Sequence, residues 1–167
     1  MNLVKSIREY DPEHYQKTVD WLNQKDIQDM FGITYAVTLD SHQKWLLSCP
    51  QVEILPLYFN EEYIGNIVLT HNLRHKTAYL QIYIGDSQFR GKGLGEEFMK
   101  LCLDRCFKNQ TIHRLWLHVR EYNEIAIKLY SKLGFQTEGI ERESVLVNQK
   151  FLNQIRMSIL QKDWVSK

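Results

Sequence analysis

Apolar and polar residues alternate along the middle of the chain in three runs that are typical of β-strands. Strands are predicted over residues 52–59, 63–70 and 77–85, and the polar residues 60–62 predict a tight turn between the first two. Another strand is predicted over residues 3–8. The three central segments follow one another closely, so the pattern indicates an antiparallel meander.

Helical patterns precede this meander. Asp11, Pro12 and Glu13 are typical of a helix start, with an N-cap, a proline at the first position and an acid in the first turn, and this helix is expected to reach about residue 23. Residues 25–48 also follow a helical pattern, but polar residues interrupt it, and this region is the least informative part of the chain.

The second half of the chain alternates helices with strands. A helix is predicted from Leu94 to about residue 109, because apolar residues recur at positions 94, 98, 101, 102 and 106. A strand (114–119), a helix (123–133) ended by Gly134, and two strands (135–141 and 151–160) joined around residues 147–149 are expected after it. This order predicts an α/β (α+β) fold in which helices flank a central sheet of mixed antiparallel and parallel strands.

The stretch Arg90-Gly91-Lys92-Gly93-Leu94-Gly95 joins the third strand of the meander to the following helix. Its glycines are therefore expected at a helix N-terminus, where unpaired backbone N–H groups and the positive end of the helix dipole favour an anion. Lys92 opposes the dipole there, which makes an anionic partner more attractive. The stretch predicts a phosphate-binding site, with a glycine-rich turn that holds no ligand as the alternative.

Two other phosphate-binding motifs do not fit this stretch. A Walker loop has four residues between its first glycine and a Gly-Lys pair, followed by Ser or Thr, whereas five residues separate Gly85 from Gly91 here and Gly93 follows Lys92. A dinucleotide fingerprint is one residue longer than this run, and too little chain remains after Glu121 to complete a dinucleotide site.

Composition is that of an ordinary globular protein. With 167 residues, of which 44% are apolar and 25% charged, one domain over residues 1–167 is expected. The 21 basic and 20 acidic side chains leave a net charge of +1, so no overall field attracts nucleic acid or an anionic membrane. Three cysteines without paired spacing, and an N-terminus without an apolar leader, predict a cytoplasmic location.

Two blocks of residues carry a resemblance to a known family. Arg90, Gly93 and Gly95 match the signature Arg/Gln-x-x-Gly-x-Gly/Ala of the GCN5-related N-acetyltransferases (GNAT). A second block of that family matches at Asn123, Ala126, Tyr130, Leu133-Gly134-Phe135 and Gly139. Residues 139–160 further resemble the branch that contains spermidine, ribosomal-protein N-terminal and amino-sugar acetyltransferases.

The resemblance implies a GNAT-like fold and acetyl-CoA as the acetyl donor. It implies that the pyrophosphate lies on the backbone of residues 90–95 and that the pantetheine arm runs along the preceding strand, between it and the strand over 114–119. The cofactor-binding residues expected from the resemblance are Ile82, Tyr83, Ile84, Arg90, Gly91, Lys92, Gly93, Leu94, Gly95, Asn123 and Tyr130. Asn123 has a second interpretation as the N-cap of the helix that follows it.

Direct transfer to an amine needs a neutral amine and a proton for the departing thiolate. A primary amine of pKa near 10 is only about 0.1% neutral at pH 7, which costs about 4 kcal/mol. Tyr130 matches the family's tyrosine and is the predicted acid, with a half-buried structural tyrosine as the alternative. No base stands out, and Glu53 is chosen because it begins a central strand.

Other groups of residues suggest little chemistry. The aromatic residues in and just before the region over 25–48 could floor a substrate pocket and hold an ammonium group, although most such residues are core: they are Trp21, Phe31, Tyr35 and Trp45. Cys102 and Cys106 share a helix face without a histidine pair nearby, so buried thiols rather than a metal site are expected. No metal is expected.

The sequence therefore predicts an acyltransferase that moves an acetyl group from acetyl-CoA to a primary amine of a small molecule in a ternary complex. Only Asp26 and Asp29 lie close together as acids in the acceptor region, which favours an amino sugar or small amine slightly over a polyamine. A protein N-terminal acetyltransferase and a non-catalytic acyl-CoA sensor are the alternatives. Strand edges near the C-terminus could pair two copies, so a homodimer stays open.

Overall fold

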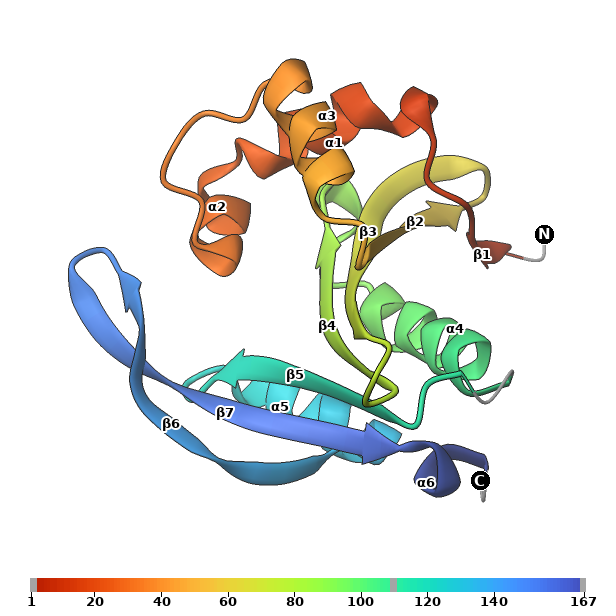
Figure 1. Ribbon diagram of the computed structural model, residues 1–167, viewed down its shortest axis with the longest axis vertical. Helices are drawn as coiled ribbons and strands as arrows, with labels where there is room; N and C mark the ends of the chain where they lie inside the picture. The colour runs from red at the N-terminus through yellow and green to blue at the C-terminus, as the bar shows by residue number, and fades with distance from the viewer. Residues whose placement is uncertain (1–2, 109–110, 166–167) are drawn as a thin grey trace. The chain divides into compact units, whose positions relative to one another are not determined.

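The computed structural model describes residues 3–108 and 111–165 (Figure 1). The strands are β1 (Lys5–Ile7), β2 (Val52–Phe59), β3 (Glu62–Asn72), β4 (Thr77–Ile84), β5 (Arg114–Arg120), β6 (Gln136–Val147) and β7 (Lys150–Leu160). The α-helices are α1 (Tyr15–Leu22), α2 (Lys25–Phe31), α3 (Leu39–Ser48), α4 (Leu94–Lys108), α5 (Glu124–Leu133) and α6 (Gln161–Val165). Two 3₁₀ helices, η1 (Pro12–His14) and η2 (Ser87–Phe89), complete the order.

The strands follow the order β1-β2-β3-β4-β5-β7-β6 in one mixed sheet, in which β4 and β5 are parallel and the other registered pairs are antiparallel. The chain divides into two compact units. Unit 1 holds Met1–Thr70 and Ile82–Leu101, and unit 2 holds His71–Gln81 and Cys102–Lys167. Strands β3 and β4 and helix α4 contribute residues to both.

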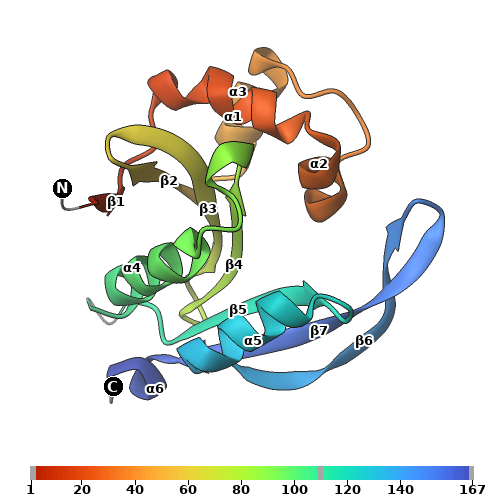
Figure 2. The ribbon, with the colours of Figure 1, turned by 180° about the vertical axis from the view of Figure 1, so that it is seen from behind.

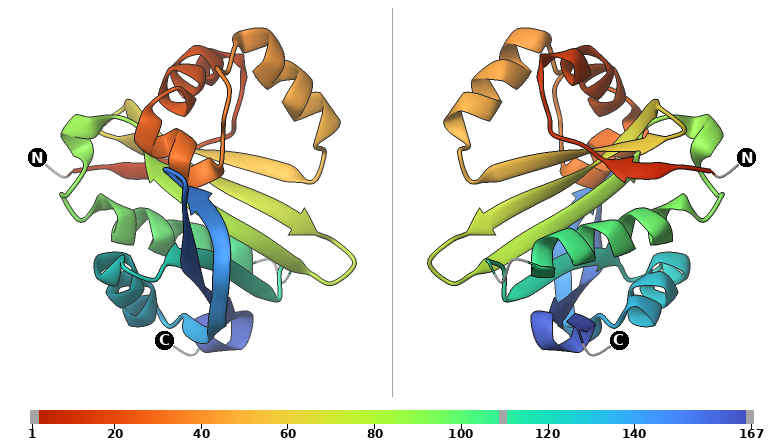
Figure 3. Two further views of the ribbon diagram at one scale, coloured as in Figure 1. Left: turned by 90° about the vertical axis from the view of Figure 1, so that its left-hand side faces the viewer. Right: turned by 90° about the vertical axis from the view of Figure 1, so that its right-hand side faces the viewer.

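In unit 1, helices lie on both faces of the strands. The short β1 pairs with β2, and β2 pairs with β3. Figure 3 shows α1, α2 and α3 over one face of these strands and the beginning of α4 on the other. Two glycines allow close packing, because a Cβ at Gly65 would lie 2.2 Å from the Tyr83 carbonyl oxygen and one at Gly85 would lie 2.0 Å from the Trp21 ring.

Aromatic rings fill the core between the sheet of unit 1 and its first helices. Trp21, Tyr63 and Tyr83 are each less than 10% exposed, and their rings lie at centroid distances of 4.7 Å (Trp21 to Tyr63) and 6.3 Å (Trp21 to Tyr83). The fully buried Asn66 accepts a hydrogen bond from the Tyr63 hydroxyl and donates one to the Tyr83 hydroxyl. Pairing of these buried polar groups removes the penalty of burying them and fixes the ring positions.

In unit 2, β5 lies between β4 and β7, and β6 is the edge strand. Residues alternate along β5, with Leu115, Leu117 and Val119 buried and the residues between them half-buried. Figure 2 shows α5 against one face of β5 and β7, while β6 and β7 continue as a long hairpin past the end of α5 (Figure 1).

The predicted α/β mixed sheet is confirmed, and so are the three strands of the meander. Their burial does not alternate as expected, since β2 and β3 are buried over most of their length. The uninformative region forms α2 and α3, and α6 was not expected. The N-terminal helix begins as η1, with Asp11 as its N-cap, and β6 runs six residues beyond its predicted end at 141. The predicted helix end at residue 109 lies outside the described residues. None of the described helices combines the length and apolar character needed to cross a bilayer.

Candidate active site

The glycine-rich stretch forms the turn into α4, as the sequence predicts. Gly91 and Gly93 adopt left-handed backbone angles, with φ values of 71° and 74°, and α4 begins at Leu94. A side chain at either glycine would be strained, because L-residues disfavour this region of backbone space. The turn therefore presents backbone N–H groups at the positive end of a 15-residue helix.

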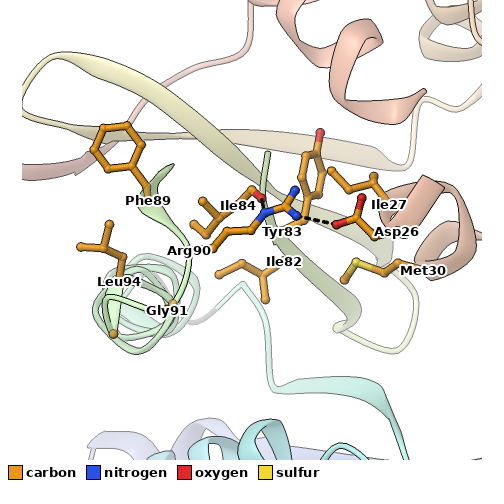
Figure 4. Close-up of a pocket in the computed structure, with 12 residues that line it drawn as sticks. Asp26, Ile27, Met30, Ile82, Tyr83, Ile84, Phe89, Arg90, Gly91 and Leu94 are labelled. Atoms are coloured by element: carbon orange, nitrogen blue, oxygen red, sulfur yellow. Dashed lines mark hydrogen bonds and ion pairs between the residues drawn. The ribbon is translucent and has the colours of Figure 1, made fainter. Parts of the chain in front are cut away.

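A pocket of about 350 Å³ lies at this turn, within unit 1 (Figure 4). Its lining combines the end of β4, the glycine-rich turn and one side of α2: Asp26, Ile27, Met30, Ile82, Tyr83, Ile84, Phe89, Arg90, Gly91, Gly93, Leu94 and Gly95. The structure thus brings together the predicted cofactor residues of β4 and of the turn, except Lys92. Lys92 is exposed, and its Nζ lies 5.4 Å from the centroid of the Phe89 ring.

The side chain of Arg90 is bonded to the protein. Its Nε donates to the Ile84 carbonyl oxygen (2.7 Å), and its Nη2 donates to the Gly85 carbonyl oxygen (3.2 Å) and to Oε1 of Gln24 (2.9 Å). Its Nη1 makes an ion pair with Asp26 at 2.5 Å, which Figure 4 shows as the dashed contact. Arg90 therefore ties the beginning of α2 to the end of β4 beside the pocket.

These bonds also limit what the end of β4 can offer a ligand. The Ile84 carbonyl already accepts from Arg90, and the Tyr83 hydroxyl is bonded to Asn66 in the core. Burial raises the pKa of Tyr83, so its phenol stays protonated. The side chains of Ile82 and Ile84, together with Phe89 and Leu94, give the pocket an apolar wall.

Tyr130 lies on α5 in unit 2 and is half-buried, with its ring centroid 5.8 Å from that of Phe135. Burial, with a smaller contribution from Tyr79, raises the pKa of Tyr130 to about 12. Within residues 3–108 and 111–165 we see no hydrogen-bond partner for its hydroxyl. The side chain is therefore a protonated phenol that can donate a hydrogen bond.

Asn123, the other predicted contact of unit 2, is exposed and caps α5. Its Oδ1 accepts a hydrogen bond from the Ala126 backbone N–H at 3.2 Å, which confirms the N-cap interpretation. Gly134 ends the same helix with a φ of 103°, again as predicted.

Glu53, the predicted base, is not among the residues that line the pocket. It is opposite Leu69 in the β2–β3 register, whereas the end of β4 is held beside Ile64 by the Gly85 N–H. Gly65, next to Ile64, is opposite Leu57, so Glu53 is four residues, or about 13 Å, further along β2 at about 3.3 Å per residue. This position gives no support to Glu53 as the base.

The aromatic residues expected at a substrate pocket are mostly structural. Trp21 is 4% exposed in the core, the Phe31 ring lies 5.5 Å from that of Tyr83, and Trp45 stacks on His42. Cys102 and Cys106 are buried thiols, as expected.

One group of possible metal ligands lies in the described part of the chain, formed by Asp11, Glu13 and His14. The buried His14 ring contacts the Asp11 backbone and the Tyr58 hydroxyl, so this group serves the start of η1. It gives no reason to place a metal there.

A cluster in unit 2 escaped the sequence analysis. Tyr79 on β4, Trp116 and His118 on β5, Glu141 on β6 and Arg156 on β7 lie in mutual contact. Trp116 and His118 alternate with the buried leucines of β5, so strand periodicity could have placed them on one face. Their meeting with Glu141 depends on the β5-β7-β6 strand order, which periodicity does not give.

Comparison with known proteins identifies the class to which this fold and pocket belong. Residues 9–135 match the model of the Acetyltransferase (GNAT) family. This match covers most of the chain, and the chain therefore belongs to that family.

Individual relatives are similar over shorter segments. The chain is 37% identical over 93 residues to spermidine N(1)-acetyltransferase of Escherichia coli K12, a match that covers 56% of this chain and 50% of that protein. It is 31% identical over 81 residues to N-alpha-acetyltransferase 50 of Danio rerio, covering 47% and 48%. The chain thus spans about half the length of the curated relatives it matches.

A solved structure is similar over nearly the whole chain. The crystal structure of spermidine N-acetyltransferase from Vibrio cholerae in complex with CoA and spermine aligns with a TM-score of 0.89 and 24% identity, over 96% of this chain and 98% of that one. At this identity the likeness shows the fold, and it confirms the GNAT-like architecture.

Proposed function

We propose that this protein is an acetyl-CoA-dependent N-acetyltransferase that acts on a primary amine of a small molecule. The observation that carries the proposal is the pocket at the start of α4, where Gly91 and Gly93 expose backbone N–H groups beside the end of β4. This pocket suits a ligand that has an anionic group for the helix N-terminus and an apolar arm for the end of the strand. Membership of the GNAT family makes CoA the expected source of both.

In this proposal the donor is held by the backbone more than by charged side chains. The N–H groups of residues 91–95 bind the pyrophosphate. The pantetheine arm lies along the end of β4 at Ile82 and Tyr83 and pairs with its backbone as an added β-strand would. Arg90 supports the wall of the pocket and does not bind the donor itself, because its guanidinium is engaged by Gln24 and Asp26. Lys92 contributes a solvated positive charge near the phosphates.

The reaction is direct transfer. The neutral amine nitrogen attacks the carbonyl carbon of the thioester, the carbon–sulfur bond breaks, and the sulfur takes a proton from Tyr130. The proton that the new amide nitrogen loses restores the Tyr130 phenol. A phenol whose pKa is about 12 is a weak acid toward a thiolate, so Tyr130 first hydrogen-bonds to the sulfur as negative charge develops and gives up its proton only as the nitrogen loses its own. Asn123 remains a proposed cofactor contact through its exposed amide.

The acceptor is proposed from the relatives. Two bacterial relatives, at 37% and 32% identity, are spermidine N(1)-acetyltransferases, so a polyamine stands first among the candidate amines. A protein N-terminus is the second candidate, because N-alpha-acetyltransferase 50 of Danio rerio is also similar. In the structure Asp26 is paired with Arg90 and Asp29 with Lys25. Both acids of α2 therefore already have a cationic partner in the protein, and an acceptor ammonium group would compete with it.

The proposal takes the whole chain as one acetyltransferase domain. Its support is that β3, β4 and α4 each contribute residues to both compact units, as happens within a domain more readily than between two. The expected partner is the amine alone, and neither a second protein copy nor a nucleic acid is needed for the steps above.

The experiment is a binding and turnover assay on one preparation. Acetyl-CoA at 100 times its Kd should stabilise the protein by about 2.7 kcal/mol, read as a rise in melting temperature. Thiol release should then appear with spermidine or another small amine, and peptides with free N-termini form the second arm of the panel. Stabilisation without thiol release from any amine would instead support the acyl-CoA sensor. If acetyl-CoA causes no stabilisation and no amine causes thiol release, the proposal is rejected.

A further inference from the structure

The side of the pocket formed by α2 is apolar. Helix α2 contributes Asp26, Ile27 and Met30 to the lining, all within unit 1. Figure 4 shows these side chains across the pocket from the glycine-rich turn, with Ile82 of β4 between the two sides. Asp26 is the only acid among the described residues that line the pocket, and it is paired with Arg90. The end of the pocket beside α2 is therefore an apolar space.

The backbone of α2 is held in place at this wall. Ile27 is buried in the core of unit 1, and the Phe31 ring lies 5.5 Å from the Tyr83 ring. The ion pair to Arg90 ties the first turn of the helix to the end of β4. Met30 lies between these anchored positions, so the helix fixes the point from which its side chain extends.

The side chain of Met30 is the adaptable part of the wall. It is 42% exposed, and the contacts that fix α2 are made by its neighbours in the helix. Methionine is unbranched and flexible, so it fills an irregular space without setting a rigid shape. Its length therefore decides how deep the apolar space beside Ile82 is.

The reacting end of the donor is expected at this space. In the proposed function the pyrophosphate lies on the turn and the pantetheine arm runs along the end of β4 at Ile82 and Tyr83. Ile84 is the last residue of β4 before the turn, so an arm that reaches Ile82 has moved away from the turn. The thioester at the end of the arm is therefore directed toward the side formed by α2.

Two groups meet at the thioester, and the apolar space suits only one of them. The acceptor amine arrives as an ammonium ion, since only about 0.1% of it is neutral at pH 7. A charge placed against apolar side chains without a partner is costly, and the carboxylate of Asp26 is already paired. The alkyl part of the acyl group carries no charge, and its burial against Met30 and Ile82 is favourable.

We infer that Met30 is a specificity-determining residue that limits the length of the acyl group. With Ile82 it leaves room for the methyl group of acetyl-CoA and excludes longer straight chains such as butyryl. The inference rests on the proposed function and deepens it, because it names the class of acyl donor that the same pocket accepts. One methylene in an apolar pocket changes kcat/KM by about 10- to 200-fold, so a single side chain is enough for such a limit.

The test measures kcat/KM for acetyl-CoA and for butyryl-CoA, with the panel amine that gives most thiol release as the acceptor. In Met30→Ala the ratio of the butyryl value to the acetyl value should rise at least about tenfold over wild type, because the shorter side chain deepens the space. Alanine favours the helix, and a melting curve checks that the variant is folded.

Leu39→Ala is the matched control. Leu39 lies on α3 in the same unit, is 41% exposed against 42% for Met30, and is not one of the described residues that line the pocket. This variant should keep the wild-type ratio. A rise in the ratio in both variants would point to a general loosening of the unit and overturn the inference.

Two further results would overturn it. An unchanged ratio in Met30→Ala would show that Met30 contacts the acceptor or neither substrate, because weaker binding of the amine lowers both values alike. A wild type that uses butyryl-CoA as well as acetyl-CoA would show that no length limit exists. If Met30→Ala does not fold, Met30→Val carries the test, with a rise in the same direction but smaller.

Failure of the proposed function gives a different result. If the wild type releases no thiol from either acyl-CoA with any amine of the panel, the proposed function fails and the inference fails with it. Wild-type turnover of acetyl-CoA, with the same ratio in wild type and Met30→Ala, rejects the role of Met30 alone.

Discussion

The guanidinium of Arg90 donates to four acceptors of the protein: the Ile84 and Gly85 carbonyls, Gln24 and Asp26. Its side chain is about one-third exposed, at 35%, so these bonds are only partly screened by water. The family motif residue therefore works in this chain as a brace between α2 and the strand end. It shapes the pocket, and all three of its guanidinium nitrogens are bonded to the protein.

Replacement of Arg90 by lysine should loosen this brace while keeping the positive charge. A lysine cannot reproduce the planar fork that reaches several acceptors, so we expect a loss of about 1–2 kcal/mol in the free energy of unfolding and weaker acetyl-CoA binding. Urea denaturation and calorimetric titration measure the two quantities. Arg74→Lys, at an exposed arginine, is the control and should change neither.

An Arg90→Lys protein as stable as wild type, with the same affinity for acetyl-CoA, would contradict this account of the brace. Loss of affinity for acetyl-CoA without loss of stability would instead indicate that the guanidinium binds the phosphate of the donor.

Tyr130 should act through its hydroxyl alone. Tyr130→Phe keeps the ring against Phe135, so kcat should fall by about 100-fold while the Kd of acetyl-CoA stays nearly the same. Because the pKa of Tyr130 is raised to about 12, loss of its proton should not limit turnover until the pH nears that value. Steady-state kinetics over pH and a binding titration check both points, and an equal loss of kcat and affinity would mean that Tyr130 binds rather than donates.

At the scale of elements, the turn into α4 is the feature on which the proposed donor binding depends. Gly91 and Gly93 hold left-handed angles that free the N–H groups of the helix start, and nothing lies within 4 Å of a Cβ placed at either position. Strain rather than crowding is therefore the cost of a side chain there. Any residue other than glycine should distort the turn and the anion site with it.

Gly93→Ala should weaken acetyl-CoA binding by about tenfold, the effect of about 1–2 kcal/mol of backbone strain if the turn relaxes to a shape that binds less well. Gly139→Ala is a matched control, since nothing lies within 4 Å of its Cβ and its φ is not left-handed. Titration of both variants with acetyl-CoA measures the difference. Equal affinities would show that the turn geometry does not matter for the donor.

Local sequence predicted these elements well because their signals are local. Strand alternation gave β2 with both of its ends, and the glycine run marked the start of α4. Asn123 and Gly134 were recognised at the ends of α5 from residue type alone. The interrupted region yielded no bounds, because α2 and α3 are short and their exposed apolar positions, such as Met30 and Leu47, blur the periodicity.

At the scale of the whole molecule, pairings between distant residues decided what sequence could not. Arg90 meets Asp26 across 64 positions of the chain, and the His118–Glu141 pair requires β6 and β7 to follow β5 in the sheet. Glu53 was a reasonable choice by sequence, but the β2–β3 register places it opposite Leu69 and away from the pocket. Sequence periodicity predicts which face of a strand a residue lies on, but the register between strands decides which residue of the next strand lies beside it.

The proposed function requires that one protein both bind acetyl-CoA and pass its acetyl group to an amine. The most direct measurement incubates the protein with acetyl-CoA and spermidine and follows the free thiol and the acetylated amine together, the latter by mass spectrometry. We expect one acetylated amine for each CoA released, with both signals reduced together in Tyr130→Phe. Thiol release without an acetylated amine, across a panel of small amines and peptide N-termini, would contradict it.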